Sequence, residues 1–168
     1  METPLSTLCY IEHEDSYLML HRTKKEHDIN KDKWIGVGGH FEEGESPDDC
    51  LVREVREETG LTLISYHLRG VLTFSTNDWP TEYIFLYTAT ADVHELPECN
   101  EGDLVWVLKS EIDSLNLWEG DRIFFRLLEE REEVFSLKLS YQDDTLISAV
   151  LNGIPMDGFP SSGNTGNP

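Results

Sequence analysis

The chain has 168 residues, which is long enough for one domain with a sizeable core. It carries 33 acidic and 13 basic residues, a formal net charge of −20, so its overall field opposes the binding of duplex nucleic acid and of anionic membranes. A small phosphate-rich substrate remains compatible with this charge, provided that metal ions and local basic residues offset the field.

The chain begins with a predicted β-hairpin. Residues 5–11 and 17–20 are mostly apolar and flank the polar turn of residues 13–16. The next segment, residues 22–33, holds five of the 13 basic residues: Arg22, Lys24, Lys25, Lys31 and Lys33. It is expected to be either a mobile loop that helps to neutralise a bound polyphosphate, with Arg22 and Lys24 as candidate substrate-binding residues, or an ordinary solvated loop. Residues 34–37 then form a short strand that leads into glycines.

Residues 47–59 are predicted to form a short helix. Ser46 is a suitable N-cap, and Pro47 suits the first helical position because its missing N–H would have no partner there. Gly60 supplies the left-handed residue that ends the helix. Leu51, Val52 and Val55 form an apolar stripe that can pack on a sheet.

Three acidic residues lie on one face of this helix. At ~100° per residue, Glu54, Glu57 and Glu58 fall within an arc of roughly 100°. Such like charges repel each other, which indicates a bound cation; oxygen ligands without sulfur suit Mg²⁺, with Mn²⁺ as a substitute, rather than zinc. The alternative is that the acidic helix is only a solvated face.

The rest of the chain alternates strands with one more helix. Four further strands are predicted from apolar, β-branched and aromatic runs, and a fifth closes a hairpin: residues 63–74, 82–91, 104–108, 134–139 and 145–151. Residues 118–130 have helical spacing, with Ile123, Leu127 and Leu128 as the core face. This order predicts an α/β fold in which helices cover both faces of a mixed sheet. Residues 1–154 form the domain, and residues 155–168, rich in Gly, Ser, Asn and Pro, form a disordered tail.

The cysteines and the lengths of the apolar runs indicate in which cellular compartment the protein is expected. Cys9, Cys50 and Cys99 are odd in number and lack CxxC spacing, which argues against a disulfide framework and a zinc site. No apolar run approaches the ~20 residues needed to span a bilayer, and the N-terminus lacks the pattern of a signal peptide. We expect a cytoplasmic protein, monomeric or homodimeric, with no membrane contact.

The segment that contains the first helix resembles the Nudix box. The box consists of a Gly, five residues, a Glu, seven residues, and then Arg-Glu-apolar-x-Glu-Glu-x-Gly-apolar. Every specified position is matched, by Gly39, Glu45, Arg53, Glu54, Val55, Glu57, Glu58, Gly60 and Leu61. The resemblance implies a Nudix-type α/β/α sandwich and metal-dependent hydrolysis of a diphosphate linkage.

The same resemblance implies roles for individual residues. Glu57, Glu58 and the Gly39 carbonyl would ligate Mg²⁺, and Glu54 would ligate it or take a proton from water. Arg53 and Glu45 would form an ion pair that fixes the loop on the helix. Glu101, outside the box, would be a further ligand or base; the alternative is an ordinary glutamate on an acidic rim.

A second resemblance concerns the substrate. Residues 117–121, followed by Phe124 and Phe125, and residues 140–146 resemble oxidised-purine nucleoside triphosphatases of the MutT class. That resemblance implies that Trp118 stacks on a purine, Asp121 bonds its edge and Phe74 lines the pocket, whereas core packing is the alternative for Trp118. The polar amide that those enzymes carry directly after a tryptophan corresponds here to Ile35.

The leading functional hypothesis is a pyrophosphohydrolase. Activated water would attack a nucleoside triphosphate in line, releasing the monophosphate and pyrophosphate, with 8-oxo-dGTP or a related oxidised purine nucleotide as a candidate substrate. The alternatives are a Nudix hydrolase of ADP-ribose or a dinucleoside polyphosphate, and a non-catalytic nucleotide-binding module. The first alternative ranks lower because Pro80 lies late for the proline typical of those subclasses, and the second because the box is intact.

Overall fold

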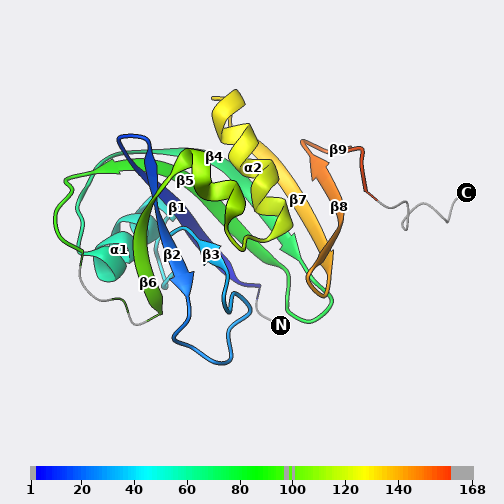
Figure 1. The fold of residues 1–168 in the computed structure, drawn as a ribbon. Coiled ribbons are helices and arrows are strands. Elements are labelled where there is room, and N and C mark those ends of the chain that lie inside the picture. Colours follow the sequence, from blue (N-terminus) through cyan, green and yellow to red (C-terminus); the bar gives the residue numbers. More distant parts are fainter. Residues whose placement is uncertain (1–2, 97–98, 100, 160–168) are drawn as a thin grey trace, which may run out of the picture.

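The computed structural model describes residues 3–96, 99 and 101–159 of the chain. Within them, nine strands form one sheet in the order β3-β2-β1-β5-β4-β7-β8-β9, with β6 paired to β2 (Figure 1). The strands are β1 (Leu5–His13), β2 (Ser16–Arg22), β3 (Trp34–Ile35), β4 (Leu63–Ser75), β5 (Glu82–Ala91), β6 (Gly102–Leu108), β7 (Phe135–Gln142), β8 (Thr145–Leu151) and β9 (Ile154–Pro155). The helices are α1 (Pro47–Thr59), the 3₁₀ helix η1 (Lys109–Ser114) and α2 (Glu119–Glu130).

The sheet is mixed, as predicted. β1 runs parallel to β5, from Leu5 opposite Tyr83 to Glu12 opposite Thr90, and β4 runs parallel to β7. The other pairs are antiparallel, including the predicted hairpins β1–β2 and β7–β8 and the long pair β4–β5. The glycine loop that follows β3 also lies along β1, because Cys9 and Val37 exchange backbone hydrogen bonds and the Thr7 N–H donates to the Gly39 carbonyl.

The two α-helices cover opposite faces of the sheet (Figure 1). Successive residues of a strand point to opposite faces. In β1, Cys9 and Ile11 accordingly pack in the cluster that contains Leu51 of α1, whereas Tyr10 packs in the cluster that contains Phe124 of α2. The predicted α/β/α sandwich is therefore confirmed.

Helix α1 has the predicted bounds. The Ser46 side chain accepts from the Asp49 N–H, the Asp49 carboxylate accepts from the Ser46 N–H, and Gly60 ends the helix in the left-handed conformation at φ 74°. Both caps are local in sequence, which is why the residue pattern predicted them. At 13 and 12 residues, α1 and α2 are shorter than a membrane-spanning helix, and no other described helix is longer.

Three expectations need correction. The apolar run of residues 104–108 predicted a buried strand, but β6 lies at the sheet edge, and Val105 and Leu108 are exposed. Ile123 of α2 is only partly buried, and Phe124 takes its place in the core beside Leu127 and Leu128. Val52 of α1 is exposed and does not pack on the sheet with Leu51 and Val55. In addition, the η1 helix was not predicted.

The tail also begins later than expected. Ile154–Pro155 pairs with β8, and the Met156 N–H donates to the Ala149 carbonyl at 2.8 Å. Met156 and Phe159 pack against the core on the α2 side of the sheet. Residues 155–159 are therefore part of the fold, while the expectation for residues 160–168 lies outside the described residues.

Candidate active site

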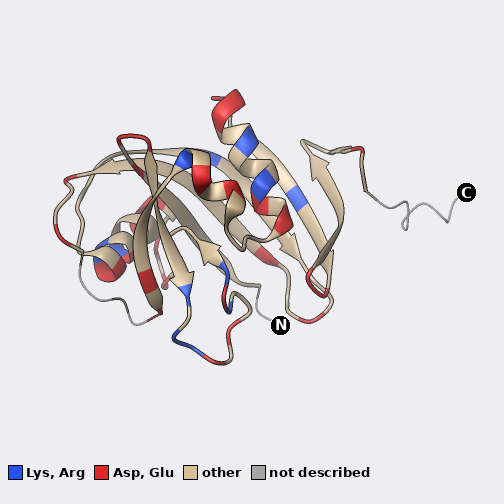
Figure 2. Ribbon diagram, in the orientation of Figure 1, with Lys and Arg blue, Asp and Glu red and all other residues tan. Residues whose placement is uncertain are grey.

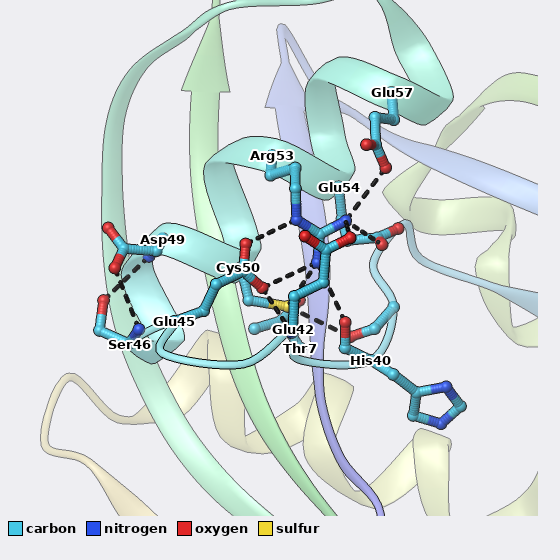
Figure 3. Close-up of polar contacts among 11 residues, drawn as sticks. Thr7, His40, Glu42, Glu45, Ser46, Asp49, Cys50, Arg53, Glu54 and Glu57 are labelled. Atoms are coloured by element: carbon cyan, nitrogen blue, oxygen red, sulfur yellow. Dashed lines mark hydrogen bonds and ion pairs between the residues drawn. The ribbon is translucent and has the colours of Figure 1, made fainter.

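Arg53 and Glu45 form the predicted ion pair (Figure 3). Arg53 Nε and Nη2 donate to the two Glu45 carboxylate oxygens at 2.6 and 2.8 Å, and Nη2 also donates to the His40 carbonyl at 3.1 Å. The Arg53 guanidinium, aided by the Glu42 N–H, lowers the pKa of Glu45 to about 2. This two-pronged contact ties the glycine loop to α1.

The same guanidinium also reaches two of the helix acids. Arg53 Nη1 donates to Glu54 Oε1 at 2.7 Å and to Glu57 Oε2 at 3.0 Å (Figure 3). Its positive charge thus offsets the repulsion expected between these carboxylates. Arg53 lies between the loop and the acidic face of α1, and it orients groups on both.

The two glycines before the box helix allow close approach. A Cβ on Gly38 would lie 2.0 Å from the Thr7 carbonyl oxygen, and a Cβ on Gly39 would lie 2.5 Å from Glu54 Cδ and Oε2. Both distances are far below a normal contact, so the sequence Gly38-Gly39 lets the loop lie on β1 while the Glu54 carboxylate packs on its backbone. Burial raises the pKa of Glu54, and Arg53 opposes that rise.

Glu58 is the most buried acid of the group. Its Oε1 accepts from the Gly38 N–H at 2.7 Å, while its Oε2 is buried without a partner among the described residues. Burial, followed by the charges of Glu101 and Glu54, raises the pKa of Glu58 to about 8 against the opposing Gly38 N–H. A cation beside that unpaired oxygen would favour the ionised form.

Glu101 joins these acids from the segment before β6. Its carboxylate accepts from Arg22 Nη1 at 2.5 Å, lies 3.5 Å from Lys25 Nζ, and contributes to the raised pKa of Glu58. Glu54, Glu57, Glu58 and Glu101 are called the carboxylate cluster below. Arg22 also lies at this cluster and binds Asp28 through Nε, whereas Lys24 is directed to the Cys99 carbonyl and not to the cluster.

The carboxylate cluster fits a hard divalent cation by its chemistry. It offers only oxygen donors, and one of them, Glu58 Oε2, is buried and unpaired. In the described ranges no three acidic, His or Cys side chains converge as a ready-made metal cage. Arg53 holds Glu54 and Glu57, and Arg22 holds Glu101, so these carboxylates would exchange arginine contacts for metal contacts. The Gly39 carbonyl, the remaining predicted ligand, already accepts a hydrogen bond from the Thr7 N–H at 2.9 Å.

A second group of candidate residues surrounds the start of α2. Trp118, the residue before the helix, is 4% exposed, and its Nε1–H donates to Asn30 Oδ1 at 2.8 Å. The rings of Phe74 and Tyr141 lie 5.1 and 5.0 Å from the Trp118 ring, both edge-on. These three rings are called the aromatic cluster below. Trp118 packs within the core, and Lys33 Nζ lies 4.9 Å from its ring centroid.

Asp121 is buried in the first turn of α2. No described group donates a hydrogen bond to its carboxyl, and burial raises its pKa to about 8, a rise that Lys33 and Arg122 oppose. This raised pKa favours the protonated carboxyl, which can both donate and accept a hydrogen bond. The Gly120 N–H donates to the Tyr141 hydroxyl, which fixes the start of α2 on β7.

The loop of residues 22–33, which carries both basic and acidic residues (Figure 2), reaches both groups. The Arg22 N–H donates to the Lys33 carbonyl at 2.9 Å, and the Asp32 N–H donates to the Arg22 carbonyl at 2.7 Å. The two ends of the loop therefore lie side by side, with the Arg22 side chain at the carboxylate cluster and the Lys33 side chain at the aromatic cluster. The remaining lysine side chains of the loop contact protein oxygens: Lys24, Lys25 and Lys31.

Sequence reasoning missed a polar chain beside the glycine loop. Ser6 Oγ donates to Glu82 Oε2 at 2.5 Å, and the same oxygen lies 3.5 Å from His40 Nε2. The hydrogen bond that His40 donates to the Glu82 carboxylate raises the pKa of His40. Asn30 and Lys33 beside Trp118 were missed as well. These contacts join residues far apart in the chain, so no local spacing signals them.

A family model described as the NUDIX domain matches residues 2–128. The chain is 33% identical over 121 residues to an uncharacterized Nudix hydrolase, YvcI, of Bacillus subtilis, covering 68% of this chain and 72% of that protein. It is also 33% identical over 125 residues to the oxidized purine nucleoside triphosphate hydrolase of Mus musculus, covering 73% and 79%.

Solved structures agree with these relatives. A MutT protein from Bacillus halodurans matches with a TM-score of 0.79 and 26% identity over 90% of this chain and 99% of that one. A MutT protein from Methanosarcina mazei matches with a TM-score of 0.68 and 25% identity, covering 77% and 96%.

Proposed function

Because the chain belongs to the Nudix hydrolase family and to its MutT class, we propose that it hydrolyses nucleoside triphosphates to the monophosphate and pyrophosphate. The observation that carries this proposal is the loop of residues 22–33, whose paired ends bring one cation to the carboxylate cluster and another to the aromatic cluster. A substrate with phosphates at one end and a base at the other matches that arrangement.

The carboxylate cluster would serve the phosphate end. Glu54, Glu57, Glu58 and Glu101, with the Gly39 carbonyl, would hold Mg²⁺, for which Mn²⁺ can substitute. A divalent cation held there neutralises phosphate oxygens and lowers the pKa of water. Members of the family generally use divalent metal ions.

This chain's own residues would do the remaining work at the phosphates. Glu54 or Glu101 would take the proton of the attacking water, and a raised carboxyl pKa, as at Glu54, suits that role. Arg53 would orient Glu54 and Glu57. Arg22, released from Glu101, would contact the phosphates, and Lys24 would join it if its contact with the Cys99 carbonyl breaks.

The aromatic cluster would receive the base. Trp118 would stack on a purine, Phe74 would line the pocket, and Asp121 would bond the edge of the base through its protonated carboxyl. The mouse relative, at 33% identity, is named for oxidised purine nucleoside triphosphates, which supports 8-oxo-dGTP as a candidate substrate.

The test is a panel of nucleotides with Mg²⁺ and identification of the products. We expect purified protein to convert dGTP and 8-oxo-dGTP to monophosphate and pyrophosphate, and to act poorly on ADP-ribose and diadenosine polyphosphates. Asp121→Asn should change the ratio of kcat/KM between 8-oxo-dGTP and dGTP more than it changes hydrolysis of dCTP. Faster hydrolysis of ADP-ribose than of every triphosphate would refute the proposal.

A further inference from the structure

Lys33 covers the surface on which a base would stack. Its ammonium lies 4.9 Å from the centroid of the Trp118 ring, a distance at which a cation is attracted to the face of an indole. Its other recorded polar contact is a long one, 3.5 Å to Asn116 Oδ1. Stacking a base on that face of Trp118 requires the ammonium to leave it.

The backbone of Lys33 is held by hydrogen bonds, whereas its ammonium makes only the two long contacts described above. The Lys33 N–H donates to the Asn30 carbonyl at 2.8 Å, and its carbonyl accepts from the Arg22 N–H at 2.9 Å. Asn116 holds the preceding residue, because its Nδ2 donates to the Asp32 carbonyl at 2.9 Å. The ammonium is therefore carried on a four-carbon stem whose backbone attachment is held beside Trp118.

The other cation near Asp121 is already engaged. Arg122 Nη1 donates to the Asp113 carbonyl and carboxylate at 2.8 and 3.0 Å, and Nη2 reaches the Leu115 carbonyl. Lys33, by contrast, has no ion pair with any described carboxylate. It is thus the cation available to a base that enters between Trp118 and Asp121.

We propose that Lys33 is a specificity-determining residue that selects purines with a carbonyl group at the six-position over purines with an amino group there. An ammonium only donates hydrogen bonds. Guanine presents two acceptors, O6 and N7, on one edge, whereas adenine presents the N6 amino donor beside N7. When an incoming base displaces the Lys33 ammonium from the Trp118 face, the ammonium can donate to O6 and N7 of guanine. On adenine it meets the N6 amino group, which is itself a donor and opposes it. Ile35 carries no polar group that could make this distinction.

The inference rests on the proposed function, since it assumes that a purine nucleotide occupies the aromatic cluster. It is tested with a pair of nucleotides that differ at the six-position, dITP and dATP. We expect Lys33→Met, which keeps an unbranched stem but removes the charge, to lower the dITP-to-dATP ratio of kcat/KM by about tenfold, the loss typical of one charge-assisted hydrogen bond. Lys33→Arg should retain most of the ratio.

The matched control is Lys31→Met, which removes the same charge from the same loop at a side chain bound to the Thr23 carbonyl. It should leave the ratio unchanged. Equal scaling of dITP and dATP in Lys33→Met would overturn the inference, and so would a fall in the ratio in the control.

Calorimetric titration with dIMP and dAMP separates this inference from the proposed function, because it needs no turnover. Binding of dIMP in preference to dAMP by the wild type, lost in Lys33→Met and kept in Lys33→Arg, supports the role of Lys33 even if no triphosphate is hydrolysed. Equal affinities of the wild type for dIMP and dAMP would refute it whatever the hydrolysis results.

Discussion

The backbone N–H of Arg22 donates to the carbonyl of Lys33, and the side chains of these two residues reach different parts of the site. Arg22 contacts Glu101 of the carboxylate cluster, and Lys33 covers Trp118 of the aromatic cluster. The hydrogen-bonded ends of one loop consequently place one cation at each cluster.

Glu57→Gln should lower kcat at saturating Mg²⁺ by at least ~10²-fold, because it removes a charge expected to hold the metal against the phosphates. The Glu57 side chain is 58% exposed, so the fold should survive with little change in melting temperature. Steady-state kinetics and thermal unfolding measure the two effects. Glu43→Gln, another exposed acid of the same loop and helix unit, should keep full activity. Full activity of Glu57→Gln, or of the wild type in excess chelator, would contradict the assignment.

Gly39→Ala should displace the Glu54 carboxylate, because the new Cβ would lie 2.5 Å from it. Displacing a reacting group by about 1 Å can cost ~10²-fold in rate, so kcat should fall by about that factor. A double-mutant cycle in thermal unfolding checks the cause. In the Glu54→Ala background the destabilisation by Gly39→Ala should largely vanish, and simple additivity would locate the clash elsewhere.

Asp121→Asn should change the pH dependence of stability. The folded-state pKa of Asp121 is raised from its ordinary 3.8 to about 8, so the carboxyl stays protonated in the folded state while it ionises in the unfolded state. Its contribution to the unfolding free energy is therefore fully present below pH ~4 and is lost as the pH rises through about 8, by up to ~1.4 kcal/mol per pH unit.

Asparagine does not titrate, so this part of the decline should be absent from the variant. Urea unfolding of both proteins from pH 4.5 to 8.5 measures the difference, and Glu58, which titrates in the same direction in both, cancels from it. Parallel pH profiles for the two proteins would show that Asp121 is ionised in the folded state across this range.

Truncation should distinguish β9 from the residues beyond it. Ending the chain after Gly153 removes the pairing of Ile154–Pro155 with β8 and the packing of Met156 and Phe159, and it should lower the unfolding free energy by ~1–3 kcal/mol. Ending it after Phe159 should leave both stability and activity unchanged, because residues 160–168 have little apolar surface to bury. Equal melting temperatures for the two truncated chains would contradict this boundary.

Local features of the chain predicted most of the fold. The bounds of α1 follow from Ser46, Pro47 and Gly60, each within a few residues of the helix end that it caps. The position of β6 in the sheet was harder to predict, because its apolar sequence suits a buried strand as well as an edge strand, and only the strand order decides between them. The packing of Phe159 was also hard to predict from local sequence, because it depends on where the sheet ends.

The candidate site was predictable only in part, because many of its contacts depend on the arrangement of the strands and not on local spacing in the chain. The box spacing identified Arg53 and its partner Glu45, eight residues apart. The pairing of Ser6 with Glu82 spans 76 residues and follows from the register of β1 beside β5. Lys33 could be recognised as a basic residue, but its position over Trp118 depends on the backbone hydrogen bonds that hold the two ends of its loop together.

Strand β1 is enclosed on every side: β5 pairs with one edge, the glycine loop and β2 with the other, and the clusters that contain α1 and α2 cover its two faces. The β1 amide hydrogens that donate to β5 can therefore exchange with deuterated solvent only when the sheet itself opens, at a free energy close to that of global unfolding. The Thr7 and Cys9 amides, which donate to the Gly39 and Val37 carbonyls, thus report how firmly the glycine loop is docked. Local release of that loop would speed the exchange of these two amides ahead of those that donate to β5.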